Sequence, residues 1–314
     1  MKPRLYLLPI FFLAAACGPG TEPAAATQEE PNGPEVITGR FVVAGHLESV
    51  YLNEASGIQA LTSGDFVLHN DEGTNLFIID AGGRHRGRIQ VLNAKNRDWE
   101  DITRIPGSEG PLIVIADSGD NDATHKRARL YFVPEPVPDE QTGNYPATIQ
   151  SIHRLKLGFP DGPRDVESVA YDPSSGMILL LSKRNKPPRL YGVALEKALA
   201  EEKADAVFLA EVPTLRGYTR EDLMRNPARG LYVSNPTGMD ISPDGRLAAV
   251  LTYRSLYVYE RAAEEAWAEA FQREPVEYLG PEGLHDEAVT FGLDGRSIYV
   301  TTERRPAPLH RLDL

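Results

Sequence analysis

One repeated unit constrains the fold of this chain more than any other feature. Each copy has a short first strand, a turn, a strongly apolar second strand that ends on a polar residue, and further strand-like runs. Four short strands per unit, separated by turns, are typical of a β-propeller blade. The first strands begin near Ser56, Glu100, Glu167, Met239 and Glu287. The sequence therefore predicts an all-β fold, a single β-propeller of five four-stranded blades.

Turn chemistry and the chain ends support this interpretation. Residues 172–176, 242–245 and 293–296 combine Asp, Pro or Ser with a late Gly, as hairpin turns do. The fifth unit has no fourth strand, and we expect residues 39–45 to supply it beside residues 309–312 and so close the ring. The long segment 214–236 is expected to be a loop with one helical turn, although its run 231–233 leaves a sixth blade possible.

The first 35 residues indicate export. Residues 1–16 combine a basic start, a short apolar run and small residues, which is typical of a signal peptide and too short to span a bilayer. Cys17 follows three alanines and is the only cysteine, so this stretch resembles a lipoprotein lipobox with Cys17 as the lipidation site. A thiol inside a signal peptide that is cut elsewhere is the alternative.

These features predict three regions. They are a lipoprotein signal peptide (1–16), a flexible linker rich in Pro, Gly, Ala and Glu (17–35), and the propeller domain (36–314). We expect an extracytoplasmic, lipid-anchored protein, held at the outer membrane if the organism has one. The formal net charge of −12 argues against nucleic acid and against adhesion of the domain to anionic lipid. A small-molecule or protein ligand at the channel mouth remains open.

Polar side chains recur at two positions of the repeat, namely the start of the first strand and the end of the second. Because first strands line the channel of a propeller, we expect these residues to meet there. In the first unit the register can place either Ser56 or Glu54 at the mouth. The predicted channel residues are Glu54, Ser56, Asp71, Glu100, Asp117, Glu167, Lys183, Tyr253, Glu287 and Glu303.

Glu100, Glu167 and Glu287 would repel one another unless a cation, Lys183 or protonation compensates them. Calcium suits such oxygen ligands, so these three glutamates are the candidate metal ligands and calcium is a possible cofactor. The alternative is structural: the glutamates accept hydrogen bonds from strand-start amides, or pair with Lys183 and Arg184, and brace the ring.

Several motifs together resemble a group of exported bacterial β-propeller lipoproteins. They are a D-W-E-D-I motif (98–102), a D-x-G-D-N loop (117–121), a D-x-E-S stretch (165–168) and a D-E-A stretch (286–288). The layout is also distantly similar to calcium-dependent propeller lactonases and phytases. No serine-hydrolase elbow, P-loop or dinucleotide motif is present. We therefore expect a binding or scaffold module with an acidic central site; the alternative is a calcium-dependent hydrolase with Asp117 or His285 as base.

Overall fold

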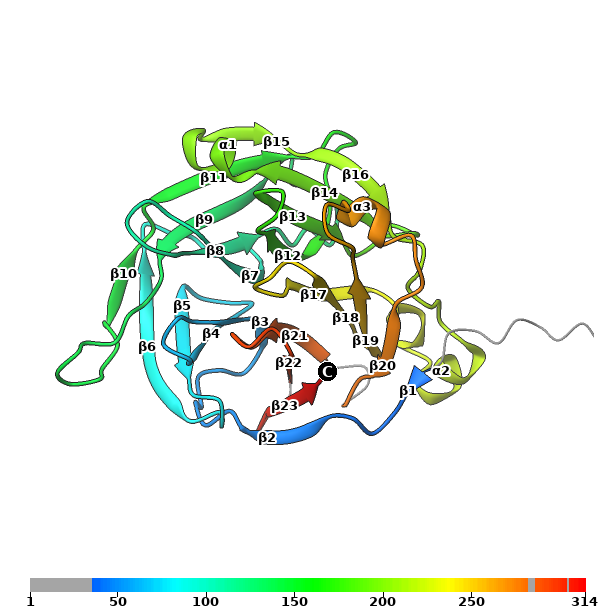
Figure 1. Ribbon diagram of the computed structural model, residues 1–314, viewed down its shortest axis with the longest axis horizontal. Helices are drawn as coiled ribbons and strands as arrows, with labels where there is room; N and C mark the ends of the chain where they lie inside the picture. Colours follow the sequence, from blue (N-terminus) through cyan, green and yellow to red (C-terminus); the bar gives the residue numbers. More distant parts are fainter. Residues whose placement is uncertain (1–35, 282–285, 304) are drawn as a thin grey trace, which may run out of the picture. The chain divides into compact units, whose positions relative to one another are not determined.

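The computed structural model describes residues 36–281, 286–303 and 305–314, which form a ring of five mainly antiparallel sheets (Figure 1). The first strand of each sheet is innermost and contacts the first strands of the two neighbouring sheets. The fold is thus a single five-bladed β-propeller, as the repeats predict. In the described part of the chain no sixth blade forms, because residues 230–232 make a 3₁₀ turn instead. No helix of that part is long and apolar enough to cross a membrane.

The strands of each blade run from the centre of the ring to its rim. The first blade contains β3 (Ala55–Ala60), β4 (Phe66–Asn70), β5 (Asn75–Ile79) and β6 (His85–Leu92). The second contains β7 (Trp99–Ile105), β8 (Leu112–Asp117), β9 (Ala128–Pro134) and β11 (His153–Gly158). The third contains β12 (Val166–Asp172), β13 (Met177–Ser182), β14 (Arg189–Ala194) and β16 (Val207–Glu211).

The last two blades follow the same order. The fourth contains β17 (Pro236–Ile241), β18 (Leu247–Thr252), β19 (Ser255–Glu260) and β20 (Val276–Leu279). The fifth contains β21 (Asp286–Phe291), β22 (Ser297–Thr302), β23 (Pro308–Asp313) and, from the other end of the chain, β2 (Val42–His46). Figure 1 shows β2 lying beside β23, where Val42 is opposite Arg311 and Val43 is opposite His310. The predicted closure of the ring is confirmed.

Three blades gain an outer fifth strand that the repeats do not predict. The added strands are β10 (Thr148–Gln150) beside β6, β15 (Lys203–Asp205) beside β11, and β1 (Val36–Ile37) beside β20. Each pairs in parallel with its neighbour. These short strands cover three blade edges that would otherwise expose unpaired backbone groups.

The strongly apolar second strands are explained by packing on both faces of each blade. In β8, Ile113 and Ile115 point into the core between the first and second blades, whereas Val114 points into the core between the second and third. A strand that is buried on both faces needs apolar residues at every position, so its sequence does not alternate. Five such cores, one between each pair of neighbouring blades, hold the ring together.

Short helices lie in the connections, namely α1 (Leu195–Ala200), α2 (Arg220–Arg225) and α3 (Trp267–Ala270). Helix α2 belongs to the long segment before the fourth blade and starts with a capping box between Thr219 and Asp222. Asp222 also accepts a hydrogen bond from Arg254 Nη1 at 2.7 Å. A second ion pair joins Arg216 Nη2 to Glu277 Oε1 at 2.8 Å. These contacts hold the segment against the fourth blade, next to the centre of the ring.

Candidate functional site

Every first strand carries a β-bulge at its start. The pairing with the second strand shifts by one residue there, so that one residue of the first strand is left without a partner. A bulge re-aims its side chain, and bulges of this kind occur next to active sites. The five bulged residues are Ser56, Glu100, Glu167, Thr237 and Glu287. Four of these side chains line one cavity at an end of the channel, whereas the hydroxyl of Thr237 donates to the backbone carbonyl of Asp286 at 2.9 Å.

Two expected positions at these bulges differ in the structure. The fourth blade contributes Thr237 rather than Met239, which lies two residues later and is buried in the core between the third and fourth blades. No acidic residue marks the bulge of β17, so no local pattern shows where that strand begins. In the first blade the bulge is at Ser56, and Glu54 lies exposed before the strand. The ring therefore gains no fourth glutamate.

The position after the second strand is also shifted in one blade. Asp71, Lys183, Tyr253 and Glu303 directly follow their strands, and Ser118 is their equivalent in the second blade. Asp117 is instead the last residue of β8, opposite Trp99, and is completely buried.

The carboxylate of Asp117 is fully engaged in structural contacts. Its Oδ1 accepts hydrogen bonds from the backbone N–H groups of Arg97 and Asp98, both at 2.9 Å, and its Oδ2 pairs with Arg129 at 3.0 Å. It braces the start of the D-W-E-D-I motif and does not face the channel mouth.

Eight of the ten predicted channel residues line one cavity of about 470 Å³ at the bulged end of the ring. The eight are Ser56, Asp71, Glu100, Glu167, Lys183, Tyr253, Glu287 and Glu303. The cavity wall is completed by Asp98, Asn121, Arg184, Arg229, Tyr232 and Asn235. Asp98 and Asn235 each stand two residues before a bulge, so the repeat could have revealed them. Arg229 and Tyr232 come from the long segment, for which the repeat contains no equivalent.

Lys183 compensates one of the glutamates. Its Nζ makes an ion pair with Oε2 of Glu167 and lies 5.1 Å from the centre of the Tyr253 ring. Burial by itself would lower the pKa of Lys183, but Glu167, Tyr253, Glu287 and Glu100 together raise it. Lys183 is therefore a permanent cation in the wall of the cavity.

The charge of Lys183 also acts on Glu100 and Glu287, but neither makes a direct ion pair with it. Their residues are only 8% and 6% exposed, and neither carboxylate has a hydrogen bond or ion pair with another described residue. Burial raises the pKa of both well above the usual range, and neighbouring carboxylates, Glu167 for Glu100 and Glu303 for Glu287, raise it further. Buried acids without partners are costly to a folded protein, so a ligand that supplies positive charge would be strongly favoured.

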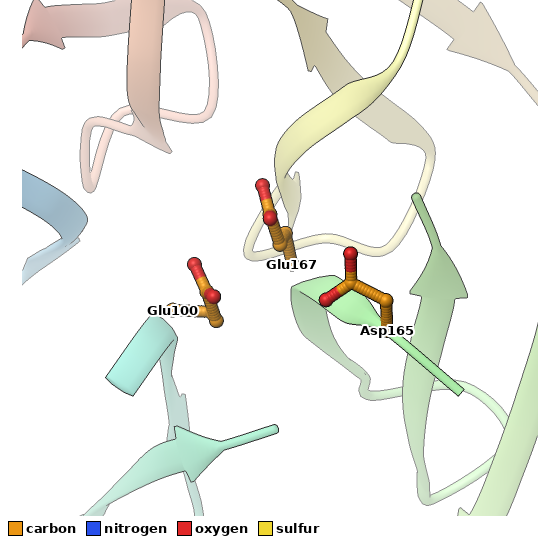
Figure 2. A group of neighbouring side chains, drawn as sticks. All are labelled: Glu100, Asp165 and Glu167. Carbon is orange, nitrogen blue, oxygen red and sulfur yellow. The ribbon is translucent and has the colours of Figure 1, made fainter. Parts of the chain in front are cut away.

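Glu100, Asp165 and Glu167 form an acidic triad that could hold a metal ion (Figure 2). Their ligand oxygens lie within 4.8 Å of one another, and the triad contains Asp165 where the sequence suggested Glu287. Asp165 already accepts from the backbone N–H of Asp120 at 2.9 Å and from Arg184 Nε at 2.6 Å. Because Glu167 is paired with Lys183, an ion in the triad would compete with both basic side chains.

Two buried aspartates brace the ring by accepting hydrogen bonds from backbone amides of neighbouring blades. Asp101 is completely buried and accepts from the backbone N–H groups of Val169 at 2.7 Å and Met239 at 3.3 Å, which belong to the next two blades. Asp240 does the same for the fifth blade through the N–H of Phe291 at 2.8 Å. The repeat pattern did not reveal this pair. Their hydrogen bonds join the inner strands of neighbouring blades, whereas among the three glutamates only Glu167 has the predicted pairing with Lys183.

Comparisons with known proteins do not assign the chain to a family. No family model and no curated protein matches it. Among solved structures, the PQQ-bound aldose sugar dehydrogenase from Streptomyces coelicolor aligns with 90% of this chain and 99% of its own length, with a TM-score of 0.46 and 12% sequence identity. The bound PQQ belongs to the structure of that dehydrogenase. The class that fold and site define here is a five-bladed β-propeller with an acidic cavity at one end of its channel.

Proposed function

We propose that this protein is a lipid-anchored binding or scaffold module of the cell envelope, and that its acidic cavity takes a cationic ligand. The observation that carries the proposal is the burial of Glu100 and Glu287 in the cavity wall without an ion pair or hydrogen bond to another described residue. The lipid anchor rests on Cys17 and the residues before it, which lie outside the described residues.

The chemistry of the cavity supports binding better than catalysis. The hydroxyl groups of the cavity belong to Ser56, Tyr232 and Tyr253. Burial raises the pKa of Tyr253, so its phenol stays protonated and is a poor base or nucleophile. No histidine is found among the described residues that line the cavity, so Ser56 has no imidazole partner of the Ser–His kind there.

A calcium-dependent hydrolase of the lactonase or phytase kind is the second candidate, and the acidic triad favours it. Asp117 is committed to backbone and arginine contacts, so it does not serve as the base. The candidate then depends on His285, which lies outside the described residues. Hydrolysis of a lactone or phosphoester by the purified protein, with loss of turnover in Glu167→Gln and after chelation, would establish this alternative.

Cation binding is tested by thermal denaturation of the full-length protein. A ligand that binds the folded state alone stabilises it by RT ln(1 + [L]/Kd) and so raises the melting temperature. We expect a panel of cations, comprising calcium, magnesium, simple amines and guanidines, to contain at least one that raises it, whereas matched anions and neutral compounds have no effect. A flat response to every cation would refute the proposal.

A further inference from the structure

We infer that the ligand of the acidic cavity is a linear primary alkylammonium, and that Glu287 binds its ammonium group. The inference rests on the proposed function and names the class of cation. The ammonium could belong to a free diamine or to the lysine side chain of another protein, because both present the same group on a flexible methylene chain.

The protein itself shows that the cavity accommodates this group. The primary ammonium of Lys183 lies in the wall, paired with Glu167 and placed over the Tyr253 ring at 5.1 Å from the ring centre. Carboxylate and aromatic face together are a favourable environment for a desolvated cation. Glu287, in the same cavity, offers a second buried carboxylate that Lys183 does not pair with.

The cavity lining contains more acidic than basic side chains. It contains six carboxylates and three basic side chains, an excess of three formal negative charges. Lys183 makes an ion pair with Glu167. Arg184 makes one with Asp165, which lies outside the lining. The carboxylates of Asp71, Glu287 and Glu303 have no ion pair with a basic residue among the described residues. This uncompensated group lies on the side of the cavity formed by the first and fifth blades.

Geometry favours an organic cation over a metal ion on that side. Within the described part of the chain, the triad of Glu100, Asp165 and Glu167 is the one trio whose oxygens approach closely enough to hold an ion. Asp71, Glu287 and Glu303 are spread too widely for one ion, but a cation with a carbon chain can span them. A cavity of about 470 Å³ has room for such a chain, and the rings of Tyr232 and Tyr253 offer apolar surface for its methylene groups.

Calorimetric titration of the full-length protein tests the inference with four probes. They are 1,5-diaminopentane, Nα-acetyl-lysine amide, 1,5-pentanediol as the neutral match of the diamine, and calcium chloride. We expect at least one of the two amines to bind and the diol to give no heat of binding. Tighter binding of the diamine points to a free diamine as the source, and tighter binding of the lysine derivative points to a protein lysine.

Variants locate the site. Glu287→Gln should weaken amine binding by about tenfold or more, because a charge-assisted contact is lost. Glu140→Gln, in an exposed loop, is the matched control and should leave binding unchanged. Glu287→Gln should also keep or raise the melting temperature, because it removes a buried carboxyl group whose ionised form is costly. Glu303→Gln, at the neighbouring carboxylate of the fifth blade, tests the same side of the cavity if Glu287→Gln does not fold.

The outcomes separate the inference from the proposed function. Binding of calcium without either amine would overturn the alkylammonium inference while cation binding stands. Amine binding that is equal in wild type, Glu287→Gln and Glu303→Gln would overturn the assigned site. Absence of binding by every cation would refute the proposed function together with the inference.

Discussion

Gly119, in the D-x-G-D-N loop, lies against two acidic side chains of the cavity. A methyl group at this position would overlap Oε1 of Glu100 and Oδ2 of Asp98, so only glycine lets both carboxylates approach the loop. We expect Gly119→Ala to displace them, weakening cation binding by about tenfold and lowering stability by about 1 kcal/mol. Gly217→Ala, where a new methyl group meets nothing within 4 Å, is the control. Equal effects of the two substitutions in calorimetry and thermal denaturation would contradict this role.

The carboxyl of Asp71 should make stability depend on pH in an unusual direction. Burial and then the charge of Glu303 raise its pKa from 3.8 to about 7. Between these values the folded state binds a proton that the unfolded state has released, so the stability contribution is full below pH 3.8 and is lost as pH rises to about 7.

Asp71→Asn should therefore gain stability over wild type as pH increases through this range. We expect about 1–2 kcal/mol at pH 8, reduced from the full shift because the side chain is partly exposed, and no gain near pH 4. Denaturant titrations of both proteins at several pH values measure the difference. A difference that does not change with pH would show that Asp71 is ionised throughout.

At the scale of elements, strand β2 closes the ring and covers the edge of β23. Its side chains add little burial, since Val42 and Val43 are 58% and 56% exposed, so the stabilisation comes mainly from backbone pairing and ring closure. A chain that begins at Leu47, without β1 and β2, should lose several kcal/mol and tend to aggregate through the bare edge. A chain that begins at Val36 is the control and should melt like the full-length protein. Equal melting temperatures of the two truncated chains would contradict the closure role.

A strand could be predicted where its own sequence specifies it, and not where it depends on a neighbouring strand. The blades could be predicted because each second strand is buried on both faces and therefore has a continuous apolar sequence, as in Ile113–Ile115 of β8. The outer parallel strands β10, β15 and β1 are two or three residues long and exist through contact with a neighbouring strand, so their sequences carry no comparable signal. Strand β2 was predictable because the fifth repeat lacks a fourth strand of its own.

For the whole molecule, the site residues that occupy equivalent positions of the repeat could be predicted from the sequence. Glu100, Glu167 and Glu287 share a bulge position, and the structure places all three in one cavity. Asp101 and Asp240 escaped prediction because their roles depend on amide groups of other blades, which no local pattern reveals. Arg229 and Tyr232 escaped because an insertion outside the repeat brings them to the mouth.

At the scale of the whole molecule, we expect the location of the protein to depend on one residue, Cys17. The described part of the chain has no membrane-spanning helix, and the formal net charge of −12 disfavours adhesion of the propeller to anionic lipid. If lipid on Cys17 is the anchor, Cys17→Ser should move the protein from the membrane fraction to the soluble extracytoplasmic fraction and abolish labelling by a fatty-acid analogue. Thr21→Ser, four residues later, is the matched control and should stay on the membrane. Membrane association of Cys17→Ser after a high-salt wash would contradict the lipid anchor, and cation binding by the released protein would show that the propeller functions without it.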